Sequence, residues 1–151
     1  MSSRQIRIGL QIFLAIVIVV LAFILYDSIT SPWEAVEQEE QLTEDTRERM
    51  SALRDAIIDF ERTEGAFPES IEVVLAYIED DDELREEFAE RFGEDFDLDS
   101  LLYSPRSGER FEYAMQDTAE AATYRLDDPE TDDYIGTLTG DVTQTNAASW
   151  E

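Results

Sequence analysis

The feature that most constrains this chain is an uncharged apolar run from Ile8 to Tyr26, nineteen residues in which Gln11 is the strongly polar exception. As a helix this run is roughly 28 Å long, close to the hydrocarbon thickness of a bilayer. A secretory signal peptide has a shorter apolar core and a small-residue cleavage site, and no Ala-x-Ala-like site follows Tyr26. The rest of the chain is too polar to surround a buried core helix. We therefore expect an uncleaved membrane anchor.

Charge is distributed unevenly on the two sides of this run. Arg4 and Arg7 lie before it or at its edge, whereas all 37 acidic residues follow it. The remaining nine Arg leave residues 27–151 with a net charge of −28. Because basic flanks stay in the cytoplasm, we expect a cytoplasmic tail over residues 1–7, a single inner-membrane span over 8–26 and a periplasmic (extracytoplasmic) remainder.

The missing residue types exclude several kinds of chemistry. The chain has no His, Cys or Lys, which rules out thiolate and imidazole metal sites, His-dependent nucleophiles, Schiff bases and a P-loop lysine. Its net charge of −26 repels a phosphate backbone, so we expect no nucleic acid partner. Paired carboxylates could hydrolyse glycosides, but among 37 acids their spacing is uninformative, and we expect no enzymatic activity.

The acidity itself has a physical explanation. Abundant Asp and Glu, with Arg but no Lys, are typical of a protein that works in high salt, where screening relieves self-repulsion. We therefore predict a halophilic source. An acidic surface that serves a basic partner is the alternative.

Residues 27–138 are expected to form one acidic α+β domain. It begins with an amphipathic stalk helix over 32–63, since Ser31 can cap a helix and Pro32 suits its first position. Pro32 also implies that the membrane helix ends or kinks before it. An apolar stripe on the stalk, together with one residue of the later sheet, gives the core candidates: Met50, Leu53, Ile57, Phe60 and Phe111.

The stalk helix is expected to stop at Gly65, with Pro68 shortly after. Short helices follow at 71–78 and 82–92. The five acids Glu79–Glu83 between them are interpreted as a solvated connector, with a cation site or a contact for an Arg-rich partner as the alternative.

Beyond residue 100 the pattern changes from helical to extended. Runs rich in aromatic or β-branched residues predict a three- to four-stranded antiparallel sheet, with strands at 101–103, 110–115, 122–126 and, as an option, around 134–138. Period-two counting places Phe111, Tyr113 and Met115 on one face, toward the helix stripe. Residues 139–151 are polar and are expected to form a flexible tail.

This layout resembles the type IV pilins, and most closely the major pseudopilins of type II secretion systems. The likeness lies in Arg54–Ile71, where a helix ends in an aromatic residue before a polar segment, Gly65, Phe67-Pro68 and a new helix. Pro105, Gly108 and Phe111-Glu112-Tyr113 are similar to a hairpin of that family. The resemblance implies a pilin-like head and a place in a secretion- or pilus-related membrane assembly.

The amino terminus departs from the family pattern. Pilins are cleaved after the Gly of a Gly-Phe-Thr-Leu-x-Glu signature, but here Gly9 is followed by Leu10-Gln11-Ile12-Phe13, and Leu14 stands in place of the Glu. We therefore expect a permanently anchored, non-enzymatic structural or interaction protein with protein partners. A processed filament subunit is the alternative, and a homo-oligomer is left open.

A loop of the later sheet contains the candidate metal ligands. Five acids surround Pro129: Asp127, Asp128, Glu130, Asp132 and Asp133. The similar pseudopilins carry a calcium-binding region here, and Ca²⁺ takes about six to eight oxygen ligands, which such a turn can offer. The spacing is not that of an EF-hand. Calcium is the one candidate ligand, and no other cofactor is expected.

Overall fold

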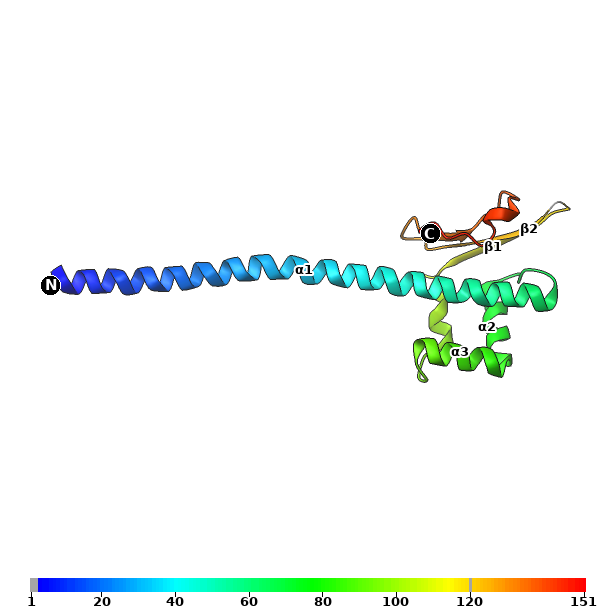
Figure 1. Ribbon diagram of the computed structural model, residues 1–151, viewed down its shortest axis with the longest axis horizontal. Helices are drawn as coiled ribbons and strands as arrows, with labels where there is room; N and C mark the ends of the chain where they lie inside the picture. Colours follow the sequence, from blue (N-terminus) through cyan, green and yellow to red (C-terminus); the bar gives the residue numbers. More distant parts are fainter. Residues whose placement is uncertain (1–2, 120) are drawn as a thin grey trace. The chain divides into compact units, whose positions relative to one another are not determined.

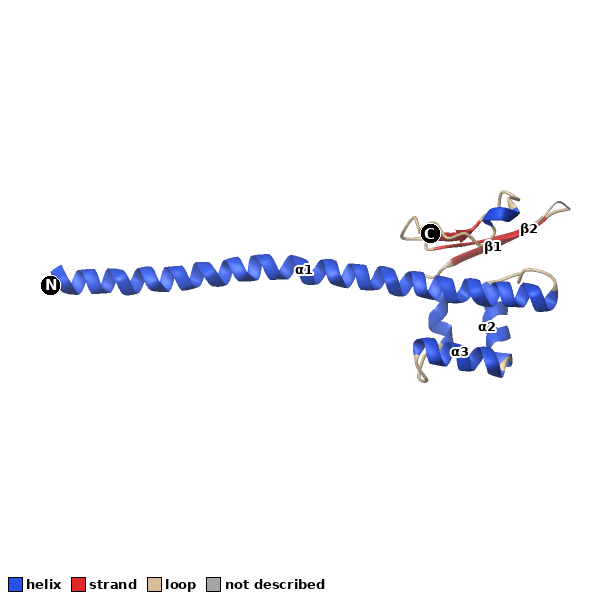
Figure 2. Ribbon diagram, in the orientation of Figure 1, coloured by secondary structure: helices blue, strands red, loops and turns tan. Residues whose placement is uncertain are grey.

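The computed structural model describes the backbone of residues 3–119 and 121–151, and the side chains of these residues other than 3–5, 27–32 and 34. Figure 2 shows an α+β protein, as predicted, in which helices come first and an antiparallel sheet follows. The chain divides into two units, Met1–Gln41 and Leu42–Glu151, which are described separately.

The first unit is the amino-terminal part of helix α1 (Ser3–Glu64). It contains Ile6–Tyr26, 21 residues that are long and apolar enough to cross a membrane, and the only such segment among the described residues. None of this segment is buried, whereas the core helix of a soluble protein would be mostly covered. The segment predicted to span a membrane is therefore an apolar helix without a buried residue.

Helix α1 continues through Pro32. This corrects the prediction that a separate stalk helix begins at residue 32. A proline removes one backbone donor and crowds one carbonyl, but the turns on either side keep their own hydrogen bonds, so the helix continues.

In the second unit, α1 ends at Glu64 and Gly65 follows it with φ 77°. Glycine adopts this left-handed conformation without steric cost, and the Gly65 N–H donates to the Glu61 carbonyl at 2.8 Å. Met50, Leu53 and Ile57 are fully buried on this part of α1.

The remaining two structural candidates of α1 and its turn lie at the edge of the core. Phe60 is half-buried, with its ring 5.2 Å from that of Tyr77. Pro68 is buried, and its carbonyl accepts a hydrogen bond from the Tyr113 hydroxyl at 2.8 Å. The turn after α1 is thereby attached to the sheet.

Two short helices, α2 (Ile71–Asp80) and α3 (Asp82–Phe92), follow as predicted. Asp81 between them has a definite role, because its carboxylate accepts hydrogen bonds from the backbone N–H groups of Glu83 and Leu84 at 2.9 and 3.1 Å. It is the N-cap of α3. The run of five acids is thus partly a helix start and not simply a solvated connector.

The sheet has strands β1 (Glu112–Asp117), β2 (Ala122–Asp127) and β3 (Tyr134–Gly136), in the antiparallel order β1-β2-β3. Met115 pairs with Tyr124, and Leu126 with Ile135. Phe111, just before β1, is 3% exposed. The optional strand near residues 134–138 is therefore the third strand of the sheet.

The prediction of a strand at residues 101–103 is wrong. Leu98–Leu102 is a short 3₁₀ helix, and Tyr103 makes only an isolated bridge with Arg110. Adjacent residues of a strand point to opposite faces, whereas Leu101 and Leu102 are both buried in the same core. A helical turn allows both leucine side chains to point into the core.

The carboxyl-terminal part of α1 contributes to both layers of this unit. Its Asp59 accepts a hydrogen bond from Tyr77 of α2 at 2.8 Å, and its Asp55 lies 3.3 Å from Arg91 of α3. Figure 1 shows α2 and α3 on one side of this part of α1 and strands β1 and β2 on the other. The core therefore forms on two faces of one helix.

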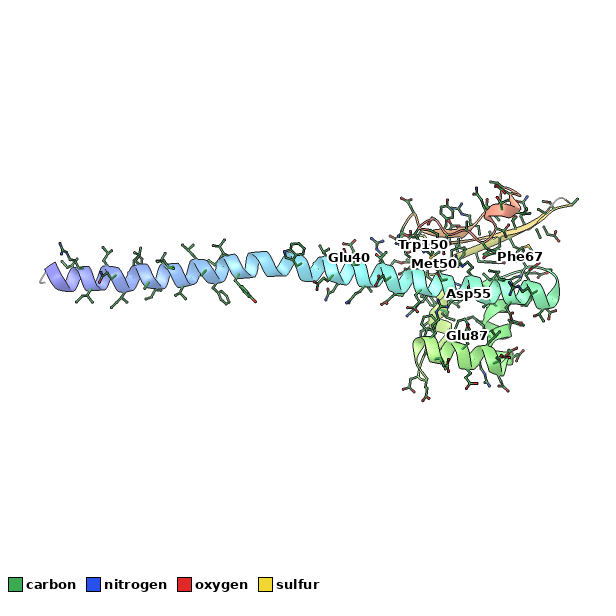
Figure 3. All side chains as sticks on the ribbon, in the orientation of Figure 1. Glu40, Met50, Asp55, Phe67, Glu87 and Trp150 are labelled. Atoms are coloured by element: carbon green, nitrogen blue, oxygen red, sulfur yellow. The ribbon has the colours of Figure 1, made fainter. Side chains whose placement is uncertain are left out.

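Residues 139–151 pack onto this core, which corrects the expectation of a flexible tail. Ala148 is buried and forms a bridge with Ile135, and Trp150 packs against the core cluster that contains Met50 (both labelled in Figure 3). Two groups of α1 hold this segment, since Arg47 lies 5.3 Å from the Trp150 ring centroid and Arg54 pairs with Glu151 at 2.9 Å.

Candidate functional site

The loop Asp127–Asp133, between β2 and β3, contains the five acids expected to bind calcium. It closes on itself through two backbone hydrogen bonds, from Asp128 N–H to the Asp133 carbonyl at 3.0 Å and from Thr131 N–H to the Asp128 carbonyl at 3.2 Å. These two bonds close the backbone of the loop into a tight turn. Each carboxylate then finds a different environment.

Asp128 is buried, with 1% of its surface exposed. Its Oδ2 accepts hydrogen bonds from the hydroxyls of Ser104 at 3.3 Å and Thr131 at 3.1 Å. Ser104 also contacts the hydroxyl of Thr46 on α1 at 3.3 Å. The result is a short chain of buried polar groups from helix to loop. Asp128 Oδ1 has no hydrogen-bond partner within the described chain.

Asp133 and Asp127 are both held by arginines. Asp133 forms a bidentate pair with Arg47 of α1, with the Nε and Nη2 donors 2.9 and 3.0 Å from its oxygens. The hydrogen bond to Asp133 raises the pKa of Arg47. Asp127 accepts from Arg125 Nε at 2.8 Å on the same strand, while the Arg125 guanidinium also lies 4.0 Å from the Tyr134 ring centroid. Charge-assisted bonds of this kind are among the stronger ones in proteins.

The loop does not bring its five carboxylates to one point. Glu130 and Asp132 are exposed. Among the described residues, no three Asp or Glu side chains form a group that could hold a metal ion. Calcium would have to compete with Arg47 for Asp133 and with Arg125 for Asp127. The calcium site thus stays a prediction. The observed ion pairs attach the loop to the rest of the second unit (Leu42–Glu151), which is called the head below.

Two grooves flank α3. One, of about 260 Å³, lies between α1 and α3, with Ala56, Ile58, Leu84 and Phe88 among its lining and Asp55, Asp59 and Glu87 as acids. Figure 3 labels Asp55 on α1 and Glu87 on α3. The other, of about 390 Å³, lies between α3 and the segment that follows, beside Arg85, Phe88 and Phe96. Both are partly open to solvent. They suit contact with another protein surface better than enclosure of a small substrate.

A cluster at the start of the head was not identified from the sequence. Arg49 of α1 donates to the carbonyls of Ser100 and Tyr103 at 2.5 and 3.1 Å, and lies 5.6 Å from the Phe96 ring centroid. Burial lowers the pKa of Arg49. Its guanidinium satisfies the carbonyls at the end of the 3₁₀ helix. The available signal was an arginine near apolar helix positions, which is too common to indicate a role.

Comparison with models of known protein families, with curated proteins and with solved structures finds no match to this chain.

Proposed function

We propose that this protein is a non-enzymatic, single-pass membrane protein that acts as a structural or interaction component of a secretion- or pilus-related membrane assembly. One observation carries the anchoring. Ile6–Tyr26 forms an apolar helix of which no residue is buried. Leaving so much apolar surface in water is strongly unfavourable, and a bilayer covers it.

The orientation follows from the charges beside this segment. Arg4 and Arg7 precede the uncharged run Ile8–Tyr26, and 37 acids and nine Arg follow it. The positive-inside rule then assigns a cytoplasmic amino terminus and a head outside the inner membrane, in the periplasm of a cell that has one.

The order of elements supports a role in an assembly. Helix α1 carries the apolar segment near its start and the buried Met50, Leu53 and Ile57 near its end, and short helices and an antiparallel meander follow. This is the plan that the resemblance to pseudopilins implies. Leu14, in place of the glutamate of the pilin signature, favours a permanent anchor over a processed filament subunit.

Cysteine accessibility tests both the insertion and the orientation. The natural chain has no Cys, so single Ser2→Cys and Glu130→Cys variants report one side each. A membrane-impermeant maleimide added to intact cells stripped of any outer membrane should label Glu130→Cys at once and Ser2→Cys only after lysis. Both variants should stay in the membrane pellet after an alkaline carbonate wash. The reverse labelling would overturn the orientation, and release by carbonate would overturn the anchoring.

A further inference from the structure

Gln11 places a primary amide inside the candidate span, three residues after Ile8, where the uncharged apolar run begins. At about 1.5 Å per residue, it lies roughly 4–5 Å inside the end of that run. Its side chain is exposed and has no hydrogen-bond partner in the part of the chain that the structure describes. If the span is inserted as proposed above, this amide faces hydrocarbon, where an unpaired polar group is costly. A partner for the amide is therefore expected within the membrane.

The helix surface next to Gln11 is shaped for close approach. At about 100° per residue, Ala15 and Ala22 fall within about 40° of Gln11 around the helix axis. They are the two alanines of the span. An open apolar groove of about 340 Å³ includes Ala15, and its other lining residues are Ile12, Ile16, Val19 and Val20. The leucines Leu10, Leu14 and Leu21 project about 60–100° to the other side of Gln11.

We infer that this face binds the same face of a second copy, so that two spans pack in parallel with their Gln11 amides hydrogen-bonded to each other. An amide is both a donor and an acceptor, so two copies related by a two-fold axis satisfy each other. Copies of one chain insert in the same orientation, which brings Gln11 to the same depth in both. Small residues such as Ala15 and Ala22 let the two backbones approach.

The exported parts set the salt dependence of this pairing. Each copy carries a net charge of −28 over residues 27–151, so two copies repel each other at low ionic strength. Molar salt shortens the screening length to about 3 Å and removes most of that repulsion. Pairing with a second copy therefore strengthens as salt is added. Pairing with a basic partner would weaken.

Disulfide trapping of the full chain in native membranes tests the inference. Single Ala15→Cys and Ala22→Cys variants should give several-fold more disulfide-linked homodimer than the controls Leu14→Cys and Leu21→Cys. Each control position is one residue before the alanine it is matched with, so it lies at nearly the same depth but about 100° around the helix. Trapping at Ala15→Cys should increase as KCl is raised toward the molar range.

Two further variants isolate the amide. Gln11→Leu should lower the association constant roughly three- to thirty-fold, the range for one interhelical hydrogen bond. The double variant Leu10→Gln with Gln11→Leu keeps the composition and nearly the depth but moves the amide about 100° around the helix. It should lose trapping at Ala15→Cys to the same extent.

The outcomes separate the two proposals. A carbonate wash of every variant reports insertion without reference to pairing, and release from the membrane would overturn the proposed function and the inference together. If the variants stay in the membrane, four results would each overturn the inference alone. They are equal trapping at all four positions, no trapping at any position, trapping that Gln11→Leu does not change, and trapping that falls as salt rises.

Discussion

Arg47 on α1 and Asp133 before β3 form a bidentate ion pair between residues 86 positions apart, with N–O distances of 2.9 and 3.0 Å. Next to it, Thr46 contacts Ser104, whose hydroxyl donates to the buried Asp128. One turn of α1 therefore holds both ends of the acidic loop. These contacts make the loop part of the framework of the head.

A double-mutant cycle of Arg47→Gln and Asp133→Asn should give a coupling free energy of about 1 kcal/mol toward stability. Asp133 has only 14% of its side chain exposed, so solvent screens the pair less than an ordinary surface pair. The matched control is Arg85 and Asp82, whose side chains are 53% and 92% exposed and whose coupling should be near zero. Urea unfolding in detergent micelles measures both, and equal couplings would contradict the structural role of the loop.

Leu53→Ala should lower the free energy of unfolding by about 2–5 kcal/mol, because its fully buried side chain leaves a cavity between α1 and its neighbours. Leu138→Ala, at a position with 36% exposure, is the control and should cost less than about 1 kcal/mol. Trp fluorescence during urea unfolding provides the measurement, since Trp150 packs against this core. A urea midpoint that Leu53→Ala leaves unchanged would contradict the proposed core.

Acid should weaken the contact between α2 and the turn before β1. The Arg110 guanidinium, with smaller help from the Ser70 hydroxyl and the Glu72 backbone N–H, lowers the pKa of Glu72 to about 2. In the unfolded chain the Glu72 carboxyl has an ordinary glutamate pKa of about 4.3. Between that pH and pH 2 the unfolded state therefore binds more protons than the folded state. The stabilisation is complete above that pH and is lost as pH falls toward 2.

This contribution should stay below about 1 kcal/mol, because both side chains are half exposed. Carbon-13 detection of the Glu72 carboxyl measures its pKa directly. Arg110→Gln should return that pKa toward about 4.3. If the value is ordinary in the natural chain, the ion pair is absent in solution.

Salt should stabilise the head, because its many acids repel one another in dilute buffer. Far-UV circular dichroism of residues 32–151 should show a weak helical signal in ~10 mM KCl that rises in molar KCl as the repulsion is screened. Replacing the exposed Glu86, Glu87 and Glu90 of α3 by Gln should lower the salt needed. A full signal at the low concentration, unchanged by salt, would contradict the halophilic interpretation.

Local signals in the sequence predicted much of this fold. Gly65 ends α1 as predicted, because glycine tolerates the positive φ that often follows a helix, and a change of pattern comes directly after it. The alternation through Phe111, Tyr113 and Met115 correctly placed one face of β1 toward the core. These signals act over a few residues, so they can be read without tertiary information.

Features that depend on distant contacts could not be predicted. The segment 139–151 looks polar and unstructured, yet Ala148 forms a bridge with Ile135 and Trp150 lies next to Arg47. Arg54 also donates to the Asn146 carbonyl. Similarly, the acids of the loop were identified, but nothing local pairs Asp133 with an arginine 86 residues earlier. The 3₁₀ helix at Leu98–Leu102 depends on the burial of two adjacent leucines, which only the assembled core defines.

The intact mass of the protein extracted from its native membrane tests the central claim most directly. A permanent anchor predicts a chain that begins at Met1 or Ser2 and retains the basic residues Arg4 and Arg7. A chain that begins at Leu10 would show that a peptidase cuts after Gly9, would contradict the permanent anchor, and would favour a processed filament subunit instead.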